Sequence, residues 1–208
     1  MPANRTGLVA GIAAAALFVA VSTVEALTRP AFDLSRHAIS MLSLGERGWT
    51  MVATFLVTGA LVVAMALALR RLQPGRAASL LIGGFGVGLV IAGFFPAPRG
   101  QGFPAGTPLD LEPEMTPAAI LHSVGFNLAF GCLIAACFVL AVRYRRLGRP
   151  GAANGCLVAG VGIPVLIVLG FTAVVPTGVA FYLAAVAAWA WLATIAALHL
   201  RDARVAHA

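Results

Sequence analysis

The sequence predicts an all-α, polytopic membrane protein in which six transmembrane helices form one bundle. The chain of 208 residues is 61% hydrophobic and only 10% charged, and its mean hydropathy is +0.97. Soluble domains carry roughly 25% charged residues, so this composition cannot cover a surface that faces water. Because long apolar runs fill nearly the whole sequence, we expect a single transmembrane domain over residues 1–208 and no separate soluble domain.

Six segments are long enough to cross a bilayer, whose hydrocarbon core requires about 20 apolar residues per helix. They cover residues 7–27, 49–69, 77–95, 118–141, 154–175 and 179–200. Charged residues, Pro or Gly stand at the ends of each. The first apolar run is too long for a signal peptide and has no clear small-x-small cleavage site, so we expect it to stay as an anchor.

Arginines beside the predicted helix ends indicate the orientation. Ten of them lie at the termini and in the connections after the second and fourth helices, whereas the other side has only Arg29, Arg36, Arg47 and Arg99. The positive-inside rule then places both termini in the cytoplasm, and we expect a multi-pass protein of the bacterial cytoplasmic (inner) membrane. The net charge of +7 is therefore a topology signal, and no nucleic-acid partner is expected.

Two polar loops are expected on the outer side, at residues 28–48 and 96–117. In the first loop, apolar residues recur at helical spacing and a polar stripe of Asp33, His37 and Ser40 faces the other way. This pattern predicts a short amphipathic helix at the membrane interface that begins at Asp33 and ends at Gly45. The second loop is rich in Pro and Gly and is expected to be mostly irregular until Thr116 caps the fourth helix.

Two features that resemble cofactor sites are better explained by helix packing. The run GGFGVG places Gly84 and Gly88 at GxxxG spacing inside an apolar span, which favours close helix contact over a nucleotide loop. The cysteines Cys132, Cys137 and Cys156 lack metal-ligand spacing and are expected to be buried, unreactive thiols. The sequence requires no cofactor.

Ionisable groups near the hydrocarbon are costly and are therefore functional candidates. Glu25 lies close to the outer end of the first helix, where pairing with Arg29 four residues on is slightly favoured. If Glu25 instead faces the bundle, burial would make it a proton donor. His122, near the start of the fourth helix, could act as an acid, a base or a ligand, although a single His at a helix end is more often only hydrogen-bonded.

Acid–base chemistry at the outer side needs the fewest assumptions. The candidate catalytic residues are Glu25, Asp33, His37 and His122. A Zn²⁺ site of two His and a carboxylate is weakly indicated because these residues lack motif spacing. A relay through Ser40, His37 and Asp33 is disfavoured, since groups on one helical stripe do not normally point at one another.

Other residues at the same level are candidates for substrate binding. Arg36 and Arg99 could hold a phosphate or a lipid headgroup, or could simply snorkel to the interface. Aromatic residues at this level fit an interfacial belt, and a few could line a pocket for an acyl or isoprenoid chain. The candidate substrate-binding residues are Ser40, Arg36, Arg99, Trp49, Phe95, Phe126 and Asn127.

Three stretches resemble a known family: FDLSRHAISMLSLGERGWTMVATFLVTGAL, GFFPAP with GFPAGTP, and ILHSVGFNLAF. They are similar to the bacterial six-helix integral membrane family catalogued as domain of unknown function nine-nine-eight. The resemblance covers about the first 145 residues, and its landmarks here are Asp33, His37, Ser40, Gly48, Trp49, Phe95, Pro96 and His122. It implies a six-helix fold and no particular reaction.

The chain departs from the family pattern after its Phe-Pro pair. The family usually has an Asp there, whereas this chain reads Ala97-Pro98-Arg99. A family-wide site that used this Asp would be lost here, or would take an acid from residues 110–114 instead.

These observations favour a small membrane-embedded enzyme with an outward-facing site that acts on a lipid or isoprenoid-type substrate. Cyclisation of a polyprenyl chain, hydrolysis and headgroup transfer are alternatives. A transporter, a lipid-binding protein, an accessory subunit or a sensor without chemistry are further alternatives, although no internal repeat or broken helix pair supports a transporter. The expected partners are membrane lipids and a small apolar or amphiphilic substrate.

Overall fold

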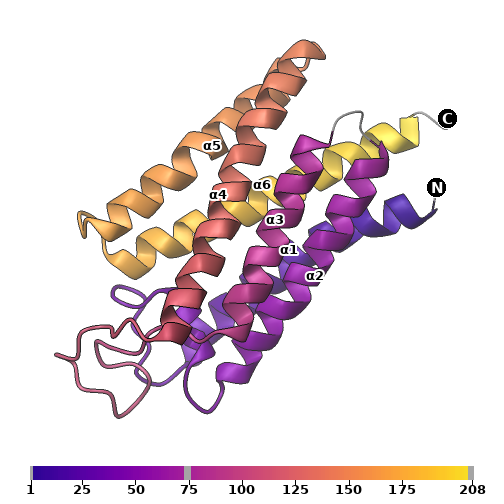
Figure 1. Cartoon of the computed structure of the whole chain (residues 1–208). Coiled ribbons are helices and arrows are strands. Elements are labelled where there is room, and N and C mark those ends of the chain that lie inside the picture. Colours follow the sequence, from indigo (N-terminus) through magenta and orange to yellow (C-terminus); the bar gives the residue numbers. More distant parts are fainter. Residues whose placement is uncertain (1, 73–75, 206–208) are drawn as a thin grey trace.

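The computed structural model describes residues 2–72 and 76–205, and this part of the chain consists of helices and loops and contains no strand. The helices are α1 (Pro2–Thr28), α2 (Gly48–Leu72), α3 (Ala77–Phe94), α4 (Pro117–Arg146), α5 (Pro150–Phe171) and α6 (Thr177–Val205), with a short 3-10 helix η1 (Ile39–Ser43) between α1 and α2 (Figure 1). All six α-helices are long and apolar enough to cross a membrane. The predicted all-α fold is confirmed, and the protein is a multi-pass integral membrane protein.

The helices follow the six predicted segments but several run beyond them. α4 continues past the apolar run to Arg146, and α6 continues to Val205. Apolar length measures only the part of a helix that faces hydrocarbon, so hydropathy underestimates helices that extend into the headgroup region. The predicted start of α4 is confirmed, because the hydroxyl of Thr116 accepts a hydrogen bond from the N–H of Ala119 at 3.2 Å.

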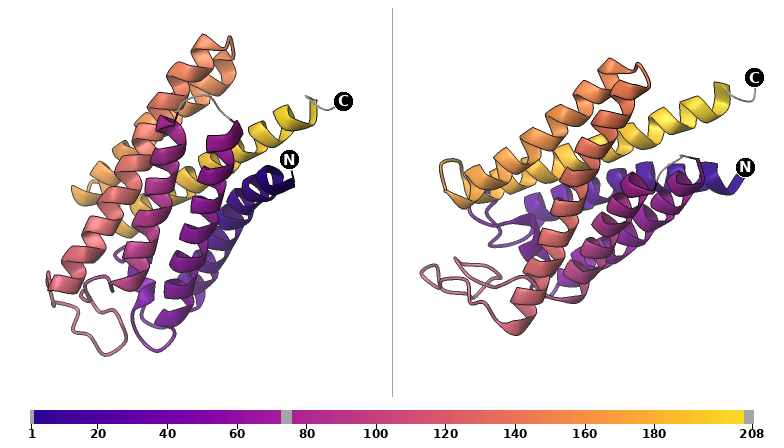
Figure 2. Two further views of the ribbon diagram at one scale, coloured as in Figure 1. Left: turned by 45° about the vertical axis from the view of Figure 1, so that its right-hand side comes forward. Right: turned by 45° about the horizontal axis from the view of Figure 1, so that its top comes forward.

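The six helices form a ring in chain order. Each packs against its neighbours in the sequence, and α6 returns to pack against α1. α1 begins and α6 ends near each other at one end of the bundle (Figures 1 and 2). We call this the termini end, and we call the opposite end, which carries residues 29–47 and 95–116, the loop end. The assignment of the termini end to the cytoplasm stays a prediction.

Glycines bring α3 into backbone contact with both of its neighbours. A methyl group on Gly86 of α3 would lie 2.7 Å from the carbonyl oxygen of Gly59 on α2. On the next face of α3, a methyl group on Gly88 would lie 2.6 Å from the carbonyl oxygen of Gly125 on α4. The predicted close helix contact at the GGFGVG run is therefore confirmed, and it fixes α2, α3 and α4 as one tightly packed layer.

The first loop is more compact than a continuous amphipathic helix. Turns cover residues 34–36, and the helical part is the 3-10 helix η1, in which Ile39, Met41 and Leu42 are buried. Gly45 ends this region with a φ of 75°. The segment thus packs its apolar residues down onto the ends of the helices, and its position at a membrane interface stays a prediction.

The second loop is irregular, as predicted, and folds back on itself. The N–H of Gln101 donates to the carbonyl oxygen of Leu111 at 2.9 Å. Gly100 and Phe103 exchange backbone hydrogen bonds, and the Phe103 side chain is only 1% exposed. The two loops therefore share a small core of their own above the helix ends.

Candidate functional site

Pro96 ends α3 and leaves its last carbonyl groups without helical partners. A residue before proline is driven to extended geometry, and Phe95 has φ −113° and ψ 125°. In a continuing helix, the carbonyl of Ala92 would accept from the N–H of residue 96, which proline lacks. The imidazole of His122 fills this gap, because its Nδ1 lies 3.0 Å from the oxygen of Ala92 and 2.9 Å from that of Phe95.

These contacts define the tautomer of His122. A carbonyl oxygen only accepts hydrogen bonds, so Nδ1 must carry the proton, and in the neutral ring Nε2 is the acceptor. Nε2 makes no hydrogen bond to any residue in the described part of the chain. His122 as a residue is only 5% exposed, so most of the ring is kept from bulk solvent.

A small cavity lies beside this imidazole, inside the ring of helices. Its volume is about 60 Å³, enough for a few waters or the end of an apolar chain, since one water needs about 10–15 Å³. Seven of its lining residues are aromatic: Phe18, Phe55, Phe85, Phe126, Phe130, Phe181 and Trp189. Ser40 of η1 and His122 are the polar side chains among the described residues that line it, and none of those residues carries a carboxylate.

The aromatic wall is a connected network rather than a belt on the surface. The Trp189 ring lies 4.9 Å from that of Phe18 and 5.3 Å from that of Phe85. The rings of Phe126 and Phe130 are 4.8 Å apart. These residues come from α1, α3, α4 and α6, so the ring of helices gathers them although the sequence separates them.

His37 is completely buried, but both of its ring nitrogens are occupied by backbone groups. Nδ1 accepts from the N–H of Asp33 at 2.9 Å, and Nε2 lies 2.8 Å from the carbonyl oxygen of Gln101. The neutral Nε2–H tautomer satisfies both contacts, and the rings of Phe32 and Phe103 pack against the imidazole. His37 thus joins the two loops and has no free nitrogen for chemistry.

Asp33 forms a local motif on the surface of the loop end. Its carboxylate accepts hydrogen bonds from the hydroxyl and the N–H of Ser35 and pairs with Arg36 at 2.8 Å. The hydrogen bonds from Ser35, assisted by the charge of Arg36, hold the pKa of Asp33 below its ordinary value. Asp33 is therefore an anion, and only its backbone N–H contacts His37.

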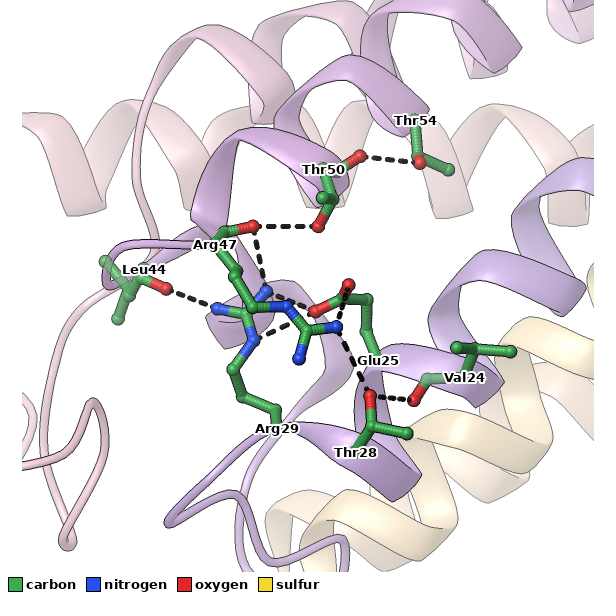
Figure 3. Close-up of polar contacts among 8 residues, drawn as sticks. All are labelled: Val24, Glu25, Thr28, Arg29, Leu44, Arg47, Thr50 and Thr54. Carbon is green, nitrogen blue, oxygen red and sulfur yellow. Dashed lines mark hydrogen bonds and ion pairs between the residues drawn. The ribbon is translucent and has the colours of Figure 1, made fainter.

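Glu25 is the centre of a charge cluster in which Glu25 and Arg29 are buried and the Arg47 side chain is 45% exposed (Figure 3). Its pairing with Arg29 is confirmed, and Arg47 donates to the other carboxylate oxygen at 2.7 Å. Arg29 also donates to the carbonyl oxygens of Leu44 and Arg47, both at 2.9 Å. The cluster carries one negative and two positive side chains, and it fastens the loop before α2 to the end of α1.

The remaining predicted residues fall into separate places. Ser40, Phe95 and Phe126 meet around His122, through the cavity or through its hydrogen bonds. Others lie elsewhere: Trp49 is 70% exposed, Arg99 is exposed, Arg36 is held by Asp33, and Asn127 donates to the carbonyl of Ser123 on an exposed face of α4. In the described residues, no group of three or more His, Cys, Asp or Glu could hold a metal ion.

The structure therefore does not bring the four predicted catalytic residues together. No hydrogen bond or ion pair joins the Glu25 or Asp33 carboxylate to either imidazole among the described residues. His122 faces the cavity, while Glu25, Asp33 and His37 stabilise the loops above it. Sequence reasoning named Phe126 and a possible apolar pocket but missed the rest of the aromatic wall, because Phe18, Phe55, Phe85 and Trp189 lie inside apolar spans where nothing distinguishes an inward face.

Comparisons with known proteins agree with this architecture. No curated protein and no solved structure matches the chain. A family described as "Protein of unknown function (DUF998)" matches residues 12–198, a range that includes the landmark residues Pro96 and His122. The match covers most of the sequence and all six helices wholly or in part, and the protein therefore belongs to this family.

Proposed function

We propose that the protein binds the apolar chain of a lipid or isoprenoid in the aromatic cavity and that His122 exchanges a proton with the bound molecule. The observation that carries this proposal is the state of the imidazole: Nδ1 is fixed by the end of α3, while Nε2 has no partner among the described residues. An apolar pocket with a few convergent polar groups is the usual form of a small-molecule site.

The hydrogen bonds of His122 allow its Nε2 to gain and lose a proton without breaking any contact. When Nε2 takes a proton, Nδ1–H keeps its hydrogen bonds to the carbonyl oxygens of Ala92 and Phe95, so the ring is held in the same position in both protonation states. His37 differs, because a proton on its Nδ1 would break the bond from the Asp33 N–H. Of the two imidazoles at the loop end, His122 is therefore our candidate acid–base residue.

The cavity favours proton removal over proton donation. No carboxylic acid is among its described lining residues, and both Glu25 and Asp33 are paired with arginine as carboxylates. A cyclisation started by either acid is therefore less well supported than deprotonation of a hydroxyl, or of a carbon next to a cationic centre, by Nε2 of His122. In either case the proton moves to Nε2, and the aromatic walls would stabilise a cationic centre.

Binding of a chain can be tested through Trp189, which lines the cavity. With Trp49 and Trp191 changed to Phe, Trp189 is the sole tryptophan. Dibromostearic acid and a brominated polyprenyl alcohol should quench its fluorescence, and the unbrominated chains should reverse the quenching. In the same background, Ala185→Leu, which fills the cavity, should weaken quenching. Equal quenching in both proteins would show that the probe does not reach the cavity.

Chemistry can be tested with His122→Asn, whose side-chain amide can retain the donor to the end of α3 but has no basic nitrogen. Lipid extracts of cells that express the two proteins are compared by mass spectrometry. We expect a product that wild type makes and the variant does not, while quenching of Trp189 is retained. Identical lipid profiles together with retained binding would contradict proton exchange.

The second candidate function is lipid binding without chemistry. It is favoured by one specific observation, which is that His122 is the sole titratable side chain among the described lining residues. Most acid–base reactions use a second group. The two tests distinguish these functions, because a pure binding protein gives quenching of Trp189 and no change in lipid composition.

A further inference from the structure

A groove of about 580 Å³ opens on the surface near the termini end, between the start of α3 and the end of α4. One wall consists of the small residues Ala77 and Ala78, and the other contains Phe138 and Val142 of α4. Phe138 and Val142 are 41% and 52% exposed, so they face outward from the bundle. This groove is separate from the aromatic cavity, with which it shares no lining residue.

The charge of the groove is concentrated at one end. Arg143 and Arg146 both line it, and because they are three residues apart near the end of α4 they lie on one face of the helix. The apolar residues Phe138 and Val142 precede them along α4. A molecule in the groove would therefore contact apolar side chains along one part of its length and two guanidinium groups at its end.

The start of α3 adds polar character to the same end. Arg76 is its N-cap residue, and the Arg76 side chain makes no capping hydrogen bond. The first N–H groups of a helix have no partners within the helix. The partial positive charge of these N–H groups therefore adds to that of Arg143 and Arg146, and both attract an anion.

We infer that this groove binds an anionic phospholipid, with its phosphate at Arg143 and Arg146 and an acyl chain along Phe138 and Val142. Guanidinium groups bind phosphate oxygens through paired hydrogen bonds. Basic pockets between transmembrane helices are a recurrent type of site for anionic headgroups. The order of apolar and charged residues matches that of a lipid, whose acyl chain lies in the bilayer and whose phosphate lies at its surface. A soluble anion would not require the apolar part of the groove.

The test is native mass spectrometry of the whole protein purified in mixed phosphatidylcholine and phosphatidylglycerol. We expect wild type to retain phosphatidylglycerol preferentially. The variant Arg146→Gln should lower that preference by about five-fold, the effect of one basic residue near an anionic membrane surface. Arg145→Gln is the matched control. It removes the same charge from the same turn of α4, but Arg145 does not line the groove.

A second variant separates a groove from a diffuse basic surface. Val142→Trp fills the apolar part, leaves all charges in place and lies on an exposed face, so it should fold and should also lower phosphatidylglycerol retention. Equal loss in Arg145→Gln and Arg146→Gln would overturn the inference. Unchanged retention in Val142→Trp, or no preference in wild type, would overturn it as well.

Discussion

His122 donates to the carbonyl oxygen of Ala92 at 3.0 Å, the same oxygen that a helix continuing through position 96 would satisfy. Pro96 prevents that continuation. Pro96 therefore ends α3, and His122 attaches the end of α3 to α4. The resemblance to the family includes both the Phe-Pro pair and this histidine, and the structure gives the physical reason why they belong together.

This relationship predicts a specific double-mutant result. His122→Phe should lower the free energy of unfolding by about 1–3 kcal/mol, because it leaves buried carbonyl groups unpaired. In a Pro96→Ala background, residue 96 regains an N–H and Phe95 is free to adopt helical geometry, so the same change should cost less. The measurement is unfolding in mixed micelles of dodecyl sulfate and dodecyl maltoside. Strictly additive effects would show that His122 and Pro96 act independently.

The two buried histidines of the loop end should be opposite tautomers. The acceptors around His122 require Nδ1–H, whereas His37 accepts at Nδ1 and donates from Nε2. Two-bond ¹⁵N–¹H correlation spectra of histidine-labelled protein at neutral pH distinguish these forms. The single variants His37→Asn and His122→Asn assign the signals. The same tautomer at both sites would contradict the hydrogen-bond arrangement.

The cluster around Glu25 should depend strongly on its one carboxylate. Glu25→Gln leaves the buried Arg29 and the half-exposed Arg47 without their anion, and breaking a buried pair such as Glu25–Arg29 typically costs about 3–5 kcal/mol. Asp33→Asn is the matched control for loss of a carboxylate, since the Asp33 side chain is 39% exposed and an exposed pair contributes about 1 kcal/mol or less.

A second variant shows that charge is the cause. In Glu25→Gln/Arg29→Gln, one of the two uncompensated positive charges is removed, so the double variant should unfold at a higher dodecyl sulfate fraction than Glu25→Gln alone. A double variant that is less stable than the single one would indicate that Arg29 contributes mainly through its bonds to Leu44 and Arg47.

Adding even one methyl group at the contact between α2 and α3 should lower the stability of the protein. In Gly86→Ala, the new methyl would meet the backbone of Gly59, and overpacking of this kind costs about 1–3 kcal/mol. Gly131→Ala on α4 is the control, because nothing lies within 4 Å of the added methyl. We expect the control to be neutral or slightly stabilised, since alanine favours helix. Equal unfolding midpoints for the two variants would show that α2 and α3 can separate without loss.

Hydropathy was sufficient to predict the helices but not the loops above them. Each membrane span carries its own signal, because the bilayer acts on every segment separately. The loop that contains His37 is different: its helical spacing is real, yet burial of Ile39, Met41 and Leu42 against the rest of the molecule favours a turn and a 3-10 helix. Tertiary contacts override local periodicity there.

The polar residues of the loop end could be predicted from the sequence, but their contacts with distant segments could not. Glu25 and Arg29 are four residues apart on one helix, so their pairing could be inferred from spacing. Arg47 joins them from another segment, and the partner of His37 at Gln101 is 64 residues away. Every residue has a backbone carbonyl, so the residue type does not indicate which carbonyl a histidine contacts. For this reason the sequence could not distinguish a histidine that joins loops from one that faces a cavity.

The glycine contacts of α3 also determine how the interior can adapt to a guest. Backbone lies against backbone at Gly59 and Gly86, and again at Gly88 and Gly125, so these three helices cannot move apart without losing a whole surface of van der Waals contact. α6 instead lines the cavity with side chains, among them Phe181 and Trp189. We therefore expect an incoming molecule to displace side chains of α6 while the opposite wall, which holds His122, keeps its shape.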